Sequence, residues 1–200
     1  MFRLFVGLDI PDSIRESLFD MTSGIPGVRW IPDENYHITL RFIGEVDRHM
    51  AEEVHYALSS VSIPAFDLQL SGIGTFEDRK RTKSLWVGVE KSTELIRMQE
   101  TVERALVKAG MSRETRRFFP HITLGRCRDV AELDIARFIQ AHNLYRSPKI
   151  PVSEFCLFSS ILTADGSHYT IEADYPTVGA PVEFDYSHTT DSHALTVEAY

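Results

Sequence analysis

The chain has 200 residues, of which 43% are hydrophobic and 25% are charged, which is typical of a globular protein with a sizeable core. No apolar run approaches the roughly 20 residues that a membrane helix requires, so a membrane-spanning helix is excluded. The formal net charge of -8 argues against an extended groove that follows many phosphates, because such surfaces are usually basic.

The sequence predicts a cytoplasmic protein. The first segment, Met1–Asp9, is too short and too soon interrupted by a charge to be a secretory signal, and it predicts the first strand instead. The two cysteines, Cys127 and Cys156, lack the spacing of a metal site and lie in apolar, strand-like segments. We therefore expect them to be reduced and buried thiols.

Five elements recur in the same order in the two halves of the chain. In the first half they are the strand Phe5–Leu8, a helical pattern that ends at Gly24, the strand His37–Leu40, the helix Asp47–Ser60 and the strand Phe66–Leu70. In the second half they are Trp86–Val89, a helical pattern that ends at Gly110, His121–Leu124, the helix Asp129–His142 and Val152–Leu157. The offset between the halves stays between 81 and 84 residues, which indicates an internal duplication. We expect Asp129 and Glu132 to form a capping box at the start of the last helix.

The pattern changes after Pro176. Residues 181–200 hold four acidic residues and no lysine or arginine. We therefore expect one domain over residues 1–176 and an acidic tail over residues 177–200 whose role in the fold is minor. Within that tail, Val182, Phe184 and Tyr186 alternate like an added strand.

The tetrapeptide His-Ile-Thr-Leu occurs twice, at His37–Leu40 and at His121–Leu124. In an extended strand, alternate side chains face opposite sides, so each isoleucine and leucine faces a core while the histidine and threonine share the other face. If the two halves bring these faces together, two imidazoles and two hydroxyls surround one small cavity. That set of groups suits a phosphate.

Two histidines can share acid and base roles in the hydrolysis of a phosphodiester. Their ordinary pKa near 6.5 allows one ring to take a proton from water while the other gives a proton to the departing oxygen. Hydroxyl groups and a guanidinium would stabilise the charge on the phosphate. Arg126 has the wrong spacing from His121 for a regular strand, and a bulge or a strand end at Gly125 would turn it toward the same face.

Several other functional interpretations of these residues remain open. A metal site is disfavoured, because each repeat supplies one histidine and no recurring carboxylate or cysteine. A module that binds an RNA end or a nucleotide without turning it over is the alternative from another class. The basic segments Arg79–Lys83 and Arg113–Arg128 are either solvated faces or contacts for a short nucleic-acid end. No cofactor is expected, since Gly72–Gly74 is far too short for a nucleotide-binding glycine loop.

At these motifs the chain resembles the LigT-like branch of the 2H phosphoesterase superfamily, the RNA 2′,3′-cyclic phosphodiesterases also called 2′-5′ RNA ligases. The resemblance covers about 175 residues. It is carried by Leu4–Leu8, the region of Trp30, His37–Gly44, Pro120–Arg126, Ser159–Leu162 and Tyr169.

The resemblance implies an α+β fold with two antiparallel sheets, related by a pseudo-twofold axis, that flank a central cleft with helices outside. It implies hydrolysis of 2′,3′-cyclic phosphate RNA ends to 2′-phosphomonoesters without a metal, and reversible 2′-5′ ligation at the same site. A related substrate, either another 2′-5′ linkage or a cyclic phosphate on another sugar, remains an alternative. RNA ends or small cyclic nucleotides are the expected substrates of a monomer that needs no protein partner and no membrane.

The resemblance also assigns roles to individual residues. His37 matches the histidine that protonates the departing 3′-oxygen, and His121 matches the histidine that activates water. Thr39 and Thr123 match the threonines that hold the phosphate. Two further matches are Arg126, as a basic residue on the phosphate, and Phe42, as an aromatic residue that stacks on the terminal base.

Overall fold

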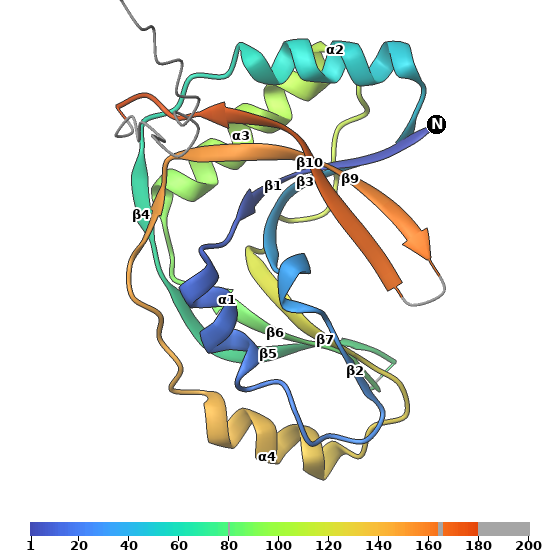
Figure 1. Cartoon of the computed structure of the whole chain (residues 1–200), viewed down its shortest axis with the longest axis vertical. Coiled ribbons are helices and arrows are strands. Elements are labelled where there is room, and N and C mark those ends of the chain that lie inside the picture. Colours follow the sequence, from blue (N-terminus) through green and yellow to red (C-terminus); the bar gives the residue numbers. More distant parts are fainter. Residues whose placement is uncertain (80, 164–165, 180–200) are drawn as a thin grey trace, which may run out of the picture.

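The computed structural model describes residues 1–179 except residues 80, 164 and 165. Two four-stranded antiparallel sheets form the centre of the molecule, and helices α2 (Arg48–Ser59) and α4 (Glu132–His142) lie at its opposite ends (Figure 1). The expected fold class, with two antiparallel sheets and flanking helices, is confirmed. Within the described residues, no helix is both long and apolar enough to cross a membrane.

The first sheet, sheet A, has the strand order β10-β9-β1-β3. Helices α2 and α3 (Thr93–Lys108) pack against each other and against this sheet. The strands are β1 (Phe2–Asp9), β3 (His37–Val46), β9 (Glu154–Thr163) and β10 (Gly166–Pro176).

The second sheet, sheet B, has the strand order β2-β7-β6-β5. Helix α4 packs against β5, and α1 (Asp12–Phe19) contacts the short 3₁₀ turn η1 (Asp33–Asn35) that leads into β3. The strands are β2 (Val28–Trp30), β5 (Leu70–Asp78), β6 (Arg81–Val89) and β7 (His121–Cys127).

The two halves of the chain exchange strands. Strand β5 comes from the first half but pairs with β6 in sheet B, while β9 comes from the second half and pairs with β1 in sheet A. Between the sheets, the equivalent strands β4 (Phe66–Leu68) and β8 (Ile150–Val152) pair antiparallel with Asp67 opposite Pro151. An antiparallel pair of equivalent strands places the pseudo-twofold axis at its middle residues. The predicted single strands Phe66–Leu70 and Val152–Leu157 are therefore each divided between two sheets.

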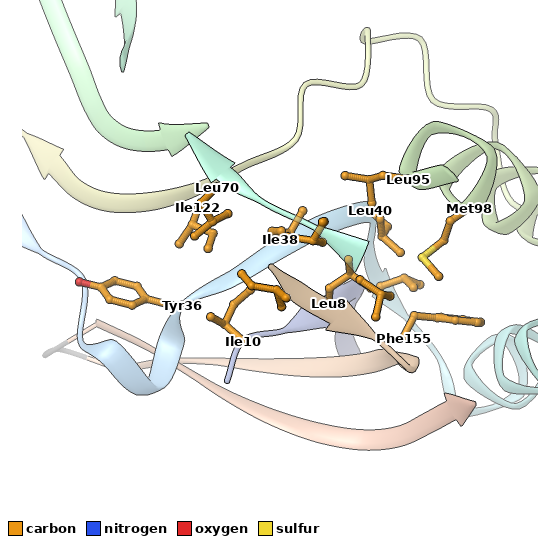
Figure 2. Close-up of a cluster of buried hydrophobic side chains, with 14 of the residues drawn as sticks. Leu8, Ile10, Tyr36, Ile38, Leu40, Leu70, Leu95, Met98, Ile122 and Phe155 are labelled. Carbon is orange, nitrogen blue, oxygen red and sulfur yellow. The ribbon is translucent and has the colours of Figure 1, made fainter. Parts of the chain in front are cut away.

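One continuous hydrophobic core joins the two sheets. Ile38 and Leu40 from β3 meet Ile122 and Leu124 from β7 in this core, and all four are at most 3% exposed. Figure 2 shows Ile38 close to Ile122, with Leu8 of β1 and Leu70 of β5 in the same cluster. The predicted inward direction of the apolar tetrapeptide residues is confirmed. Burying one such side chain contributes roughly 1.5 to 3 kcal/mol, so this core fixes the two strands relative to each other.

Local hydrogen bonds decide where two of the helices end. Helix α1 ends at Phe19 rather than at Gly24, because the Thr22 hydroxyl and amide both donate to the Phe19 carbonyl and compete with further helical bonds. Helix α3 ends as predicted before Gly110, whose φ of +99° suits glycine. Met111 N–H donates to the Leu106 carbonyl at 3.0 Å, which closes the helix end.

The predicted capping box of the last helix is wrong. Arg128 N–H donates to the Gly27 carbonyl at 2.9 Å, so the strand pairing continues beyond β7. The chain then turns at Asp129, which has a φ of +52°, and helix α4 begins only at Glu132 with Ala131 at its N-cap. At the start of α2, by contrast, Asp47 accepts from the Met50 N–H at 2.8 Å, as expected of an N-cap.

Two residues just beyond the predicted domain boundary at residue 176 bond to the domain. Thr177 is buried and its N–H donates to the Ser153 carbonyl at 2.7 Å, while Val178 N–H donates to the Ile63 carbonyl at 2.7 Å. Thr177 and Val178, which the sequence assigns to the tail, are therefore hydrogen-bonded to the domain. The predicted alternation of Val182, Phe184 and Tyr186 lies outside the described residues. Cys127 and Cys156 are free thiols, half-buried and buried respectively.

Candidate active site

The two His-x-Thr strands bring their polar faces to one cavity of about 290 Å³. Strands β3 and β7 contact each other, so His37 and Thr39 from sheet A line the same cavity as His121 and Thr123 from sheet B. Their apolar neighbours point into the core on the opposite side. The same cavity is completed by Arg3, Phe5, Ile31, Asn35, Phe42, Arg126, Ser160, Ser167 and Tyr169.

The backbone fixes the orientation of both imidazoles in the same way. The Nδ1 of His37 lies 2.7 Å from the carbonyl oxygen of Asn35, and the Nδ1 of His121 lies 2.7 Å from that of Phe119. A carbonyl oxygen can only accept, so both Nδ1 atoms carry the proton. Each neutral ring therefore has its Nε2 available as an acceptor. The Nε2 of His37 lies 3.0 Å from the Thr39 hydroxyl, which shows how closely the two groups of the motif stand.

Aromatic rings pack around His37 on sheet A. Its ring centroid lies 4.7 Å from that of Phe5 and 5.1 Å from that of Tyr169, with Phe158 behind them. Phe5, Phe158 and the buried Cys156 form a small second hydrophobic cluster on this side of the sheet. These contacts restrict the ring and remove water from one side of it.

A matching set of aromatic rings packs around His121 on sheet B. Phe76 meets it edge-on at 4.8 Å, and Trp86 and Phe119 lie at about 6 Å. The Trp86 ring covers Gly74, where a Cβ would lie within 2.2 Å of it. Only glycine therefore fits at that position of β5.

Burial lowers the pKa of both histidines. For His37, the pKa is lowered to about 4, mainly by burial; the hydrogen bond to the Asn35 carbonyl opposes this effect, and the nearby charges of His121, Arg15 and Arg126 add to it. For His121, burial also lowers the pKa, with a smaller contribution from Arg126. Both rings are therefore neutral near pH 7. An anion bound between them would raise both pKa values, because it would favour the charged imidazolium.

Irregular strand pairing turns two further side chains toward the cleft. In β7, Thr123 lies opposite Trp86 and Gly125 lies opposite Leu85, so Leu124 is the extra residue of a bulge. The bulge predicted near Gly125 is present, and Arg126 faces the cavity together with His121. In β3 the same irregularity brings Phe42 to the equivalent position, where it also lines the cavity.

The cavity has a positive character in an acidic protein. Arg3 and Arg126 line it, and none of its lining residues is an aspartate or a glutamate. The guanidinium of Arg3 lies over the Phe42 ring, 5.2 Å from the centroid. The site therefore combines two neutral imidazoles, two hydroxyls and two cations, which suits a phosphate ester.

Seven of the residues that line the cavity have no role assigned from the sequence, among them Arg3, Tyr169 and Asn35. Arg3 and Phe5 are two residues apart in the first strand, so they lie on the same face of it. This spacing is the sequence signal that could have placed both on the cleft face. Tyr169 carried part of the family resemblance but no role. Asn35, which is buried, had no sequence signal, because its side chain bonds to the carbonyl of the distant Ser167 at 2.8 Å.

The two halves are not equivalent at every strand. Asp9 of β1 lies opposite His37, whereas Gly88 of β6 lies opposite His121. The sequence offset of 81 between β1 and β6 would place Glu90 there, so the strand pairing in the two halves differs by two residues. A shift of two residues keeps the same side chains on the same face, which is why the sequence pattern did not reveal it. As a result Trp86 stands opposite Thr123, while Gly7 stands opposite Thr39.

Within the part of the chain that the structure describes, no three histidine, cysteine, aspartate or glutamate side chains are grouped to hold a metal ion. The donors that face the cavity are imidazole nitrogens, hydroxyls and guanidiniums. These groups can transfer protons and bind an anion.

The duplicated α+β fold and the paired His-x-Thr strands define a phosphoesterase of the two-histidine class. The chain belongs to the LigT-like phosphoesterase family, whose model matches residues 8–86 and again residues 87–169. The two matches correspond to the two halves of the molecule.

Curated relatives and solved structures agree with this family. A protein of Archaeoglobus fulgidus is 34% identical over 84% of this chain and 96% of its own length, and one of Aeropyrum pernix is 37% identical over 74% and 84%. Both are named RNA 2′,3′-cyclic phosphodiesterase. The crystal structure of E. coli LigT complexed with 3′-AMP is 25% identical with a TM-score of 0.72, over 88% of this chain and 98% of that one.

Proposed function

We propose that this protein is an RNA 2′,3′-cyclic phosphodiesterase, a hydrolase that opens the cyclic phosphate at an RNA end and leaves a 2′-phosphomonoester. The observation that carries the proposal is the pair of imidazoles from β3 and β7 that line one cavity, each oriented by a hydrogen bond from Nδ1 to a backbone carbonyl. The names of the relatives at 34% and 37% identity support it.

In the proposed reaction, each histidine transfers one proton. His121 takes a proton from water as the water oxygen attacks phosphorus, and the bond between phosphorus and the 3′-oxygen breaks. His37 gives its proton to that departing 3′-oxygen, so the ribose regains a 3′-hydroxyl and keeps a 2′-phosphate. The negative charge of the substrate raises the pKa of His37 from about 4, which allows it to carry this proton near neutral pH.

The remaining cavity residues hold the substrate in this proposal. Thr39 and Thr123 donate hydroxyl hydrogen bonds to the phosphate oxygens from opposite strands, and Arg126 neutralises the charge that develops there. Phe42 stacks on the terminal base, supported by the Arg3 guanidinium on its ring. A stacking contact accepts any base, so the proposed recognition is tolerant of sequence.

The same site supports ligation by the reverse path. If the 5′-hydroxyl of a second RNA strand replaces water, His121 takes its proton and the product is a 2′-5′ phosphodiester. No additional residue is required for this step. Water at high concentration favours hydrolysis.

The test is incubation of the protein with an RNA oligomer that ends in a 2′,3′-cyclic phosphate, with and without a strong chelator. We expect a 2′-phosphate product at the same rate in both samples. A 3′-phosphate product would contradict the assigned leaving oxygen, and loss of activity in chelator would contradict a reaction without a metal.

Two histidine variants test the assigned catalytic groups. His37→Ala and His121→Ala should each lower kcat by roughly a hundredfold or more, while a 2′-phosphate product still binds. The matched control is His49→Ala, an exposed histidine at the start of α2. Full activity in either cleft variant would contradict the proposal, and an inactive wild-type protein that binds RNA ends would identify a binding module instead.

A further inference from the structure

A second cavity of about 220 Å³ adjoins the active-site cleft. Five residues line both cavities, among them Asn35, Arg126 and Tyr169. The second cavity also has walls of its own, which come from Arg29 on β2 and His168 on β10. We call it the Arg29 pocket. Arg126 stands at the junction between the two cavities.

Two arginines stand side by side in the Arg29 pocket. Arg29 and Arg126 are directly opposite each other in the pairing of β2 with β7, so their side chains project from the same face of sheet B. Among the described residues, neither forms an ion pair with a carboxylate. No aspartate or glutamate lines the pocket either. Two neighbouring guanidiniums repel each other unless an anion lies between them, so this pair is suited to a phosphate.

The Arg29 pocket has a fixed position relative to the catalytic histidine. The Asn35 carbonyl accepts from His37 Nδ1 at 2.7 Å, and the Asn35 side-chain amide donates to the Ser167 carbonyl at 2.8 Å. Ser167 lies at the start of β10 and lines both cavities. One buried residue therefore holds the wall of the pocket and the ring of His37 together.

The contents of the Arg29 pocket favour a phosphate over a base. Trp30, its largest aromatic residue, is packed against Phe138 of α4 with ring centroids 5.4 Å apart. Tyr169 is held edge-on to His37 at 5.1 Å. Both rings therefore already have an aromatic partner, whereas the two guanidiniums have no carboxylate partner among the described residues.

We propose that the Arg29 pocket binds the phosphodiester that precedes the terminal nucleotide of the RNA strand, so that the protein prefers oligonucleotide ends to free cyclic mononucleotides. This inference rests on the proposed function, because it places the cyclic phosphate between the two histidines. Successive phosphates of one strand flank each ribose. The pocket lies next to the cyclic-phosphate site and offers the cations that a second phosphate needs.

Three substrates test the inference. They are a 2′,3′-cyclic mononucleotide, a dinucleotide ending in the same cyclic phosphate, and that dinucleotide with a neutral methylphosphonate linkage. We expect kcat/KM for the charged dinucleotide to exceed the values for the other two substrates by roughly tenfold or more. The reason is that one hydrogen bond to a charged group is strong enough to change binding by about that factor. Arg29→Ala should remove this preference and affect the other two substrates much less. Arg137→Ala, an exposed arginine on α4, is the matched control and should keep the preference.

Binding of the products gives a second readout that does not depend on turnover. The dinucleotide with a 2′-phosphate end should bind with a steeper salt dependence than its methylphosphonate counterpart, by roughly 0.7 in the slope of log K against log salt. Arg29→Ala should abolish that difference. Calorimetry on both products separates failure of this inference from failure of the proposed function, because an inactive protein still reports on the pocket.

Three outcomes would overturn the inference. The first is equal kcat/KM for the charged and neutral dinucleotides in the wild-type protein. The second is an equal loss for all three substrates in Arg29→Ala, which would indicate a general structural effect. The third is a loss confined to ligation of a 5′-hydroxyl strand, which would assign the pocket to the acceptor strand instead.

Discussion

At the scale of single residues, the environment of the two histidines is the feature with the clearest chemical consequence. Both rings donate Nδ1–H to a carbonyl two residues earlier in the chain, and both are partly buried, which lowers their pKa values. The first interaction fixes the tautomer, and the second keeps the rings neutral. The site is thus arranged so that an anion changes its protonation.

The first prediction concerns the pKa values of these rings. Without ligand, the pKa of His37 should lie near 4 and that of His121 below its ordinary value. Saturating 2′-AMP should raise both, because the phosphate favours the imidazolium form. NMR titration of the imidazole resonances measures this, with the exposed His49 as an internal control. Unchanged pKa values on binding would show that the phosphate lies elsewhere.

The second prediction concerns the effect of acid on stability. The pKa of His37 is about 4 in the folded protein and about 6.5 in the unfolded chain, so only the unfolded state gains this proton between those values. The neutral His37 ring therefore contributes roughly 3 kcal/mol to the free energy of unfolding above pH 6.5, and this contribution is lost as the pH falls toward 4. His37→Gln should lose less stability than the wild type over that range. Urea unfolding at several pH values would measure the difference, and parallel curves would contradict it.

At the scale of elements, a buried arginine connects the first His-x-Thr strand with the segment that precedes the second. Arg41 of β3 is 8% exposed, and its Nε donates to Glu103 of α3 at 2.6 Å. Its other nitrogens donate to the carbonyls of Phe42 and Ser112. Glu103 in turn accepts from the Glu114 N–H at 2.8 Å. The segment that leads to His121 is thereby attached to the bulge that presents Phe42.

The third prediction follows from this ion pair. Arg41→Met should lower the free energy of unfolding by roughly 3 to 5 kcal/mol, because the Glu103 carboxylate loses its partner in a largely buried position. The double variant Arg41→Met with Glu103→Leu should recover part of that loss. Denaturant unfolding of both single variants and the double variant measures the coupling. Additive effects would show that the pair is not the cause.

The sequence predicted most elements because their signals are local. The apolar alternation of both tetrapeptides, the Asp47 N-cap and the glycine after α3 each act within one turn or strand. The exchange of β5 and β9 between sheets was not predictable, since strand partners lie far apart in the chain. Asp129 was placed wrongly for a similar reason, because the hydrogen bond from Arg128 to Gly27 extends the pairing before the helix.

The candidate site was predictable to the extent that it repeats. His37, Thr39 and their partners share a frame, so the duplication indicated them, and Arg126 needed only a bulge that glycine permits. Asn35 and the Arg29 pocket have no such repeat. They depend on β10, which has no equivalent strand in sheet B.

At the scale of the whole molecule, the exchanged strands join the two halves into one unit. β5 and β9 each leave their own half, and one core extends across both sheets. The cleft lies where the halves meet, so its geometry depends on both. The molecule as a whole is acidic. Three arginines that form no ion pair among the described residues nevertheless line the cleft or the adjoining pocket, namely Arg3, Arg29 and Arg126.

The fourth prediction is that the two halves unfold together. Neither sheet can keep its strands if one half of the chain unfolds, because each sheet contains two strands from each half. Thermal unfolding followed by near-UV circular dichroism and by calorimetry should give one coincident transition. The expected single domain over residues 1–176 would be contradicted by two separate transitions.

The fifth prediction compares two truncations at the C-terminal boundary. A chain ending at residue 179 keeps the bonds from Thr177 to Ser153 and from Val178 to Ile63, whereas a chain ending at residue 176 loses both. Because each buried backbone bond contributes about 1 kcal/mol, the shorter chain should be less stable by roughly 1 to 3 kcal/mol. Urea midpoints of the two chains and of the full-length protein measure this.

The comparison also separates the tail from the domain. If the acidic residues after 179 have a minor role in the fold, the chain ending at 179 should match the full-length protein in stability and in turnover of the cyclic dinucleotide. A faster turnover in the truncated chain would instead show that the acidic tail competes with RNA for the arginine-lined cleft, because carboxylates and phosphates bind the same guanidiniums. Raising the salt concentration would reduce that difference, since screening weakens exposed contacts first.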